Sequence, residues 1–250
     1  MRNKPKRIVV IGASSLIAEH CLRLWAKDNF NEFILVGRDI SSLEPVATDI
    51  KIRSNAEVNC YSLNMNDPRS INEFALQVSE ESPVDLVLIA HGSLSNQEKC
   101  QKDLVYCANE LNINALSPVI FAEAFVVSME KYNHGQIIII GSVAGDRGRK
   151  SNYVYGASKG LVERYVQGMQ HRFARTNVRI TLVKPGPTDT PMTAHLKSKG
   201  VSLASVEFVA KSIVDGVQKG RSVIYTPAKW QLIMMIIRHL PRFVFNKLDI

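Results

Sequence analysis

The chain has 250 residues, of which 46% are hydrophobic and 22% are charged. This composition is typical of a globular protein with a sizeable core and excludes a disordered chain. The 31 lysines and arginines outnumber the 23 aspartates and glutamates, and the formal net charge of +8 favours an anionic partner. The sequence shows no aromatic-interleaved basic stripe, helix-turn-helix or zinc pattern, so we expect no nucleic acid partner.

Short apolar runs alternate with helical patterns along most of the chain. The runs predict seven strands, at 7–11, 33–37, 57–62, 84–90, 135–142, 178–186 and 221–227. Helices are expected between them, at 16–27, 43–50, 71–78, 154–175 and 206–217, with two helical stretches over 103–131. Continuous apolar strands are typical of a parallel sheet covered on both faces. We therefore expect one α/β domain over residues 1–250, a Rossmann-type doubly wound parallel sheet that binds ligands at the carboxyl ends of its strands.

The segment GSVAGDRGRKSNYVYGASKG contains the residues best suited to chemistry. Tyr155 and Lys159 are four residues apart at the start of a predicted helix, so their side chains share one face. We expect the ammonium group to lower the pKa of the phenol. Ser142 follows the apolar run IIII, thirteen residues before Tyr155. These three side chains suit proton transfer to or from an alcohol or carbonyl oxygen.

With these residues, the chain resembles the short-chain dehydrogenase/reductase family over nearly its whole length. The resemblance implies that Tyr155 is the general acid or base, that Ser142 polarises the substrate oxygen, and that Lys159 tunes Tyr155 and holds the nicotinamide ribose. The segment ELNINAL is similar to the family's helix motif and places a fourth catalytic residue at Asn112. The family commonly forms dimers and tetramers, which implies a homodimer or homotetramer.

The resemblance implies a nicotinamide dinucleotide bound at the first turn. The three positions that usually carry glycine read Gly12, Leu16 and Ala18 here. Gly12 keeps the turn tight, and the hydroxyls of Ser14 and Ser15 are expected to compensate for Leu16, beside the positive end of the helix. The alternative is a structural strand-turn-helix without a ligand.

The end of the second strand bears on the choice of cofactor. Arg38 stands there and favours the 2′-phosphate of NADPH, while its neighbour Asp39 leaves NADH open. The resemblance places further cofactor contacts at or near the ends of other strands: Ile17, Asn64, Ala90, Gly92, Tyr155, Lys159, Pro185, Thr188 and Thr190. The four cysteines lack the spacing of a zinc site or a disulfide framework, so we expect no metal and a cytoplasmic protein.

Two features bear on the substrate. Arg147 and Arg149 lie between Ser142 and Tyr155 and are expected to meet a substrate phosphate, with a solvated charge run as the alternative. The tail, residues 228–250, contains six consecutive apolar residues at 232–237 among basic ones. This run is too short to span a bilayer, which needs about 20 residues, and suits an anionic membrane interface. A subunit contact or a cover for the substrate pocket is the alternative.

Within the family, the motifs AHG, GSVAGDRGR and DTPMT and the tail are similar to those of the decaprenylphosphoryl-2-keto-ribose reductases and their bacterial relatives. This similarity implies NAD(P)H-dependent reduction of a 2-keto sugar on a polyprenyl phosphate, in cell-envelope biosynthesis at the inner face of the cytoplasmic membrane. A flavin-dependent oxidase would be the partner that produces the keto sugar. The alternatives are a soluble reductase of a 3-oxoacyl thioester or small ketone and a catalytically silent dinucleotide-binding scaffold.

Overall fold

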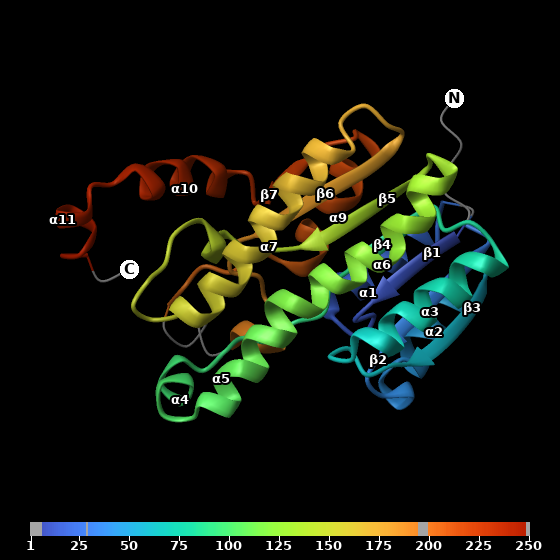
Figure 1. Ribbon diagram of the computed structural model, residues 1–250, viewed down its shortest axis with the longest axis horizontal. Helices are drawn as coiled ribbons and strands as arrows, with labels where there is room; N and C mark the ends of the chain where they lie inside the picture. The colour runs from blue at the N-terminus through green and yellow to red at the C-terminus, as the bar shows by residue number, and fades with distance from the viewer. Residues whose placement is uncertain (1–6, 29, 195–199, 249–250) are drawn as a thin grey trace.

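The computed structural model describes residues 7–28, 30–194 and 200–248. Seven parallel strands form one sheet in the order β3-β2-β1-β4-β5-β6-β7, with helices on both faces (Figure 1). The strands are β1 Arg7–Ile11, β2 Glu32–Gly37, β3 Glu57–Ser62, β4 Leu86–Ile89, β5 Gly135–Ile140, β6 Val178–Pro185 and β7 Val223–Thr226. The seven predicted strands and the doubly wound architecture are confirmed.

The central strands are apolar throughout because each of their faces packs on a separate core. In β1, Val10 belongs to the core beneath α1 Leu16–Trp25, α2 Glu44–Arg53 and α9 Val206–Gln218. Its neighbour Val9 belongs to the core beneath α3 Pro68–Glu81, α6 Ser117–Tyr132 and α7 Tyr153–Arg172. Since successive side chains of a strand point to opposite faces, a strand buried on both faces cannot alternate with polar residues.

The remaining helices lie at the carboxyl end of the sheet or beyond it. They are η1 Ile40–Ser42, α4 Gln97–Lys102, α5 Leu104–Leu111, η2 Asn112–Leu116, η3 Val143–Asp146, η4 Pro191–Thr193, α10 Lys229–His239 and α11 Arg242–Phe245. The order of the strands reverses between β1 and β4, which in such sheets marks the crevice where ligands bind.

The two helical stretches predicted over 103–131 are present as α5 and α6. A π-helical turn, η2, joins α5 to α6, and Pro118 follows directly. Proline has no amide hydrogen, so the regular i→i−4 bond to the carbonyl of Asn114 cannot form, which favours a local change of helical pitch. The whole stretch Leu104–Tyr132 is long and apolar enough to cross a membrane, but 44% of its apolar window is buried in the protein, as in the core helix of a globular fold.

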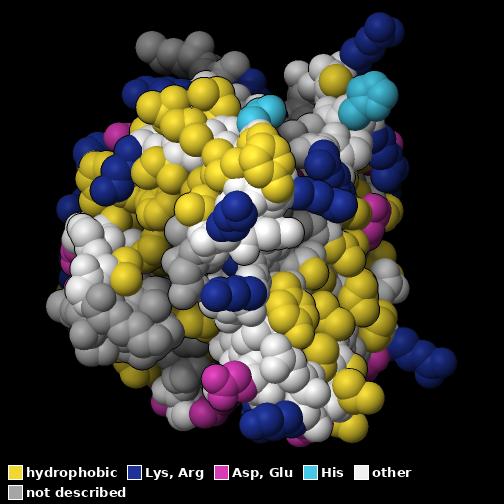
Figure 2. Space-filling model, turned by 90° about the vertical axis from the view of Figure 1, so that its left-hand side faces the viewer, with side chains coloured by type: hydrophobic (Ala, Val, Ile, Leu, Met, Phe, Trp, Pro, Cys, Tyr) yellow, Lys and Arg dark blue, Asp and Glu magenta, His cyan; other side chains and the backbone are white. Residues whose placement is uncertain are grey.

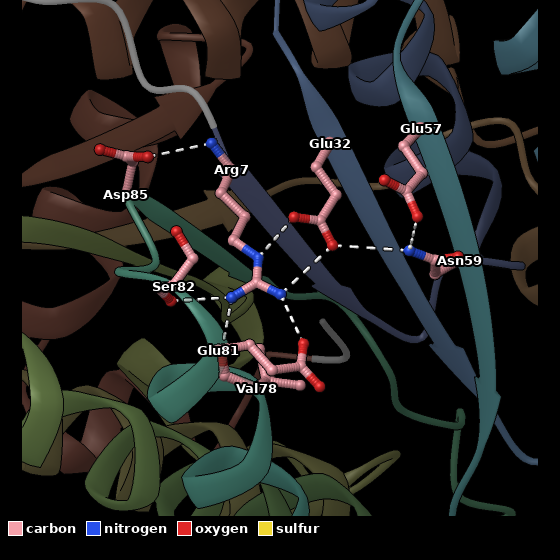
Figure 3. A network of polar contacts seen from close by, with 8 residues as sticks. All are labelled: Arg7, Glu32, Glu57, Asn59, Val78, Glu81, Ser82 and Asp85. Carbon is pink, nitrogen blue, oxygen red and sulfur yellow. Dashed lines mark hydrogen bonds and ion pairs between the residues drawn. The ribbon is translucent and has the colours of Figure 1, made fainter.

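A buried arginine joins elements at the amino end of the sheet, away from the carboxyl-end loops (Figure 3). Arg7, only 5% exposed, pairs through Nε with Glu32 at 2.7 Å and through Nη2 with Glu81 at 2.9 Å. Its Nη1 also donates to the carbonyl oxygens of Val78 and Ser82. This network ties β1 and β2 to the end of α3 and satisfies a charge that would otherwise be costly to bury.

Candidate active site

Ser142 and Tyr155 are brought together by a close contact between η3 and the backbone of α7. A Cβ atom on Gly145 would lie 2.8 Å from the carbonyl carbon of Lys159, and one on Gly156 would lie 3.0 Å from the carbonyl oxygen of Ala144. Only glycines allow the two backbones to approach this closely. Ser142 lies two residues after the end of β5 and caps η3, and its hydroxyl accepts a hydrogen bond from the amide of Ala144 at 3.1 Å.

The hydroxyl of Ser142 lies close enough to the phenol of Tyr155 to influence its pKa. Burial raises the pKa of Tyr155, and Ser142 lowers it by less. The prediction of a lowered pKa for Tyr155 is wrong for the protein alone, because the loss of hydration raises this pKa more than Ser142 lowers it. The side chain therefore keeps its proton at neutral pH.

Lys159 is almost completely buried, at 4% exposed, one helical turn after Tyr155. Its Nζ donates to the carbonyl oxygen of Ile140 at 3.1 Å and lies 5.8 Å from the centroid of the Tyr155 ring. Burial lowers the pKa of Lys159 to about 8. The ammonium group is thus held beside the phenol by the last residue of β5.

The asparagine that faces this group is Asn114 rather than Asn112. A Cβ on Gly92 would lie 3.0 Å from Oδ1 of Asn114 and 3.7 Å from Nζ of Lys159, so both side chains border the same glycine. Asn114 is completely buried, whereas Asn112 is half-exposed. Two positions along a helix correspond to about half a turn, so only one of the two can face the site. The prediction of Asn112 is corrected accordingly.

A polar cluster that the sequence did not indicate holds Asn114 in place. Its Oδ1 accepts from the amide of Ser93 at 2.9 Å, and its Nδ2 donates to the carbonyl oxygen of Glu110 at 3.0 Å. The buried carboxylate of Glu110 in turn accepts from the hydroxyls of Ser93 at 2.7 Å and Ser95 at 2.8 Å. These bonds fix the orientation of the Asn114 amide. In the sequence, the only sign of this contact is the four-residue spacing of Glu110 and Asn114, which places both side chains on one face of a helix.

The first turn has the shape expected of a pyrophosphate site. Gly12 has a φ of +78°, and a Cβ there would overlap the backbone of His91, so glycine is required. Ser15 precedes the first residue of α1, Leu16, but its hydroxyl makes no hydrogen bond to the helix. Ser14 is exposed, and Ala18 is buried against the sheet. The amides of the first turn of α1 therefore remain available to an anion.

Arg38 and Asp39, which follow β2, differ in whether their side chains already have partners. Asp39 accepts from the amide of Ser41 at 3.0 Å and from its hydroxyl at 2.6 Å, and these bonds lower the pKa of Asp39. Arg38 is exposed, and its side chain has no hydrogen bond or ion pair within the described part of the chain. The carboxylate of Asp39 is thus used to cap η1, while the guanidinium of Arg38 remains available to bind a ligand.

The other predicted cofactor residues lie at the same end of the sheet. Asn64 is exposed after β3, and its side chain accepts from the amide of Asn66 at 3.1 Å. The hydroxyl of Thr188 donates to the carbonyl oxygen of Gly186 at 3.0 Å, and that of Thr190 pairs with Thr193. The structure places the remaining members at strand ends or helix starts: Ile17 in α1, Ala90 and Gly92 after β4, and Pro185 at the end of β6.

Arg147 does not point to a substrate phosphate, which corrects that prediction. Its guanidinium donates to carbonyl oxygens at the end of α10, including that of Leu240 at 2.7 Å, and stacks on the ring of Phe245 at 3.8 Å. Carbonyl oxygens at a helix end lack partners within the helix, so a cation binds there readily. Arg147 therefore clamps the tail against the loop that follows Ser142.

The tail also covers the segment after β6. The indole of Trp230 in α10 occupies the space where a Cβ on Gly186 would be, so Trp230 borders the loop that contains Thr188 and Thr190. Among the exposed tail residues are Leu232, at 60%, and Phe243, at 71%. Figure 2, seen from the end of the molecule that carries α10 and α11, shows hydrophobic side chains gathered with basic ones among them.

Comparisons with known proteins bear on the family and the fold. An uncharacterized oxidoreductase of Streptomyces coelicolor is 26% identical over 247 residues, 98% of this chain and 96% of that protein. A short chain dehydrogenase from Burkholderia cenocepacia, solved in complex with NADP, superposes with a TM-score of 0.84 at 19% identity over the whole of both chains. An actinorhodin polyketide ketoreductase variant, solved with NADPH, superposes with a TM-score of 0.78 at 18% identity, over 88% of this chain and 95% of that one. Residues 6–200 match the short chain dehydrogenase family, and the chain belongs to this family of oxidoreductases.

Proposed function

We propose that this protein is an NADPH-dependent ketoreductase with Ser142, Tyr155 and Lys159 as its catalytic residues. The observation that carries the proposal is the grouping of three side chains: Ser142 influences the phenol of Tyr155, and Nζ of Lys159 lies 5.8 Å from the centroid of the Tyr155 ring. A protonated phenol at this position can donate its proton to a carbonyl oxygen when the carbonyl is reduced. NADPH supplies the hydride when bound.

The side chains divide the remaining work. Tyr155 donates its phenolic proton to the substrate oxygen, while the hydroxyl of Ser142 hydrogen-bonds to that oxygen and polarises the carbonyl. Lys159 stabilises the phenolate that results, because a cation next to a developing anion lowers its energy most strongly where water is excluded. We propose that Asn114, whose amide is held in one orientation, is the fourth catalytic residue of the site.

The first turn and Arg38 would hold the cofactor. The amides at the start of α1 suit the pyrophosphate, and the uncommitted guanidinium of Arg38 suits a 2′-phosphate bidentately. Because Asp39 is occupied by η1, no carboxylate at the end of β2 is left to accept the ribose hydroxyls that distinguish NADH. The structural relatives solved with NADP or NADPH support the same choice.

For the substrate, we propose a keto sugar carried on a polyprenyl phosphate, supplied by a flavin-dependent oxidase. The support is the tail, whose exposed apolar side chains lie beside the segment after β6, where a lipid chain could enter from an anionic membrane surface. The tail would then rest on the inner face of the cytoplasmic membrane. The second candidate substrate is a soluble ketone, because one of the similar structures is that of a polyketide ketoreductase.

Tyr155→Phe tests the proposal. The variant removes the proton donor, so kcat for ketone reduction should fall by about 10²–10⁴-fold, while the dissociation constant of NADPH, followed by fluorescence, should stay unchanged. Tyr153→Phe is the matched control, because Tyr153 lies on the same helix and is 45% exposed. Full activity in Tyr155→Phe, or no NADPH binding by the wild type, would contradict the assignment.

A further inference from the structure

The loop between Ser142 and Tyr155 contains a cation that the protein itself leaves uncompensated. Arg147 binds the tail and is already occupied. Arg149 is half-buried, and its Nε is fully buried without a hydrogen-bond partner. Neither a hydrogen bond nor an ion pair joins its side chain to any other residue that the structure describes. Its terminal amino groups are not among the buried atoms without a partner.

The carboxylate nearest in sequence cannot neutralise Arg149. Asp146 is committed at both oxygens, with Oδ1 paired to Nζ of the buried Lys184 and Oδ2 accepting from the hydroxyl of Tyr225 at 3.0 Å. Lys184 also pairs with Glu163 at 2.8 Å, so this cluster holds its own charges. Burial lowers the pKa of Arg149 more than the charge of Asp146 raises it.

We propose that Arg149 is the anion-binding residue of the substrate site and that it takes a phosphate group of the substrate. Withdrawing a guanidinium from water without a partner is costly, and the cost is offset when an anion binds to it. The planar guanidinium suits two parallel hydrogen bonds to phosphate oxygens. The inference rests on the proposed ketoreductase function, since the loop that contains Arg149 connects Ser142 to Tyr155.

Binding of a simple phosphate ester tests this assignment directly. Glycerol 3-phosphate and uncharged glycerol would be titrated calorimetrically into the wild type and Arg149→Met, with and without saturating NADPH to occupy the cofactor's own anion sites. We expect the wild type to bind the ester in preference to glycerol and Arg149→Met to bind it at least tenfold more weakly. Arg149→Lys, which keeps the charge but loses the planar fork, should fall between them. Arg175→Met, at an exposed arginine, is the control and should bind like the wild type.

A stability measurement separates a binding role from a structural one. Removal of an uncompensated cation should raise the melting temperature of the ligand-free protein by about 2–4 °C, whereas loss of a structural arginine should lower it. A wild type that does not bind the ester, or an Arg149→Met variant that binds it equally well, would overturn the inference. If the wild type and Arg149→Met bind NADPH with equal affinity, the cofactor site is intact in both, and a failure to bind the ester then concerns Arg149 alone.

Discussion

The contact between η3 and α7 predicts that Gly145→Ala damages both stability and catalysis. The new Cβ would lie 2.8 Å from the carbonyl carbon of Lys159 and 2.9 Å from the amide nitrogen of Gly160. Both neighbours are backbone atoms of a helix and cannot rotate away. Reaching an ordinary contact of 3.4 Å requires η3 to move off α7 by about 0.6 Å, the difference from 2.8 Å.

The size of the two effects follows from this displacement. Overpacking of this kind costs about 1–3 kcal/mol of the free energy of unfolding, measured by urea denaturation. Ser142 begins η3 and would move with it, away from Tyr155. Because a 1 Å misplacement at a reacting centre costs about 10²-fold, kcat for ketone reduction should fall about tenfold.

Gly148→Ala provides the matched control in the same loop. A Cβ on Gly148 would meet no atom within 4 Å, so this variant should keep the stability of the wild type to within about 0.5 kcal/mol and its full kcat. Wild-type stability in Gly145→Ala would refute the packing argument. A destabilised variant with an unchanged kcat would show that this contact does not position Ser142.

Two further predictions concern charged side chains. Burial lowers the pKa of Lys159 to about 8 from 10.5, so the folded protein binds fewer protons than the unfolded chain between these values. Its stability should therefore rise with pH above about 8, relative to Lys159→Met, by on the order of 3 kcal/mol in total, and parallel pH profiles would contradict this. Arg147→Met should release the tail, because it loses the carbonyl bonds and the Phe245 stacking, so trypsin should cleave faster at Arg238. An unchanged cleavage rate would show that the clamp is not what holds α10.

The sequence by itself determined the sheet. Continuous apolar runs such as those of β1 and β4 are stable only when buried on both faces, and this local property predicts parallel strands wherever the chain places them. The sequence also indicated that Ser142, Tyr155 and Lys159 belong together, because helical spacing and the end of an apolar strand are local features.

Only the tertiary structure decided three matters that depend on distant parts of the chain. Asn112 and Asn114 are equivalent in a sequence motif, and only the packing of η2 decides which of them faces Gly92. Arg147 reads as a loop cation until the tail returns to it from about 90 residues further along the chain. The direction of the Tyr155 pKa shift depends on burial, which the whole fold sets, and burial raises this pKa more than Ser142 lowers it.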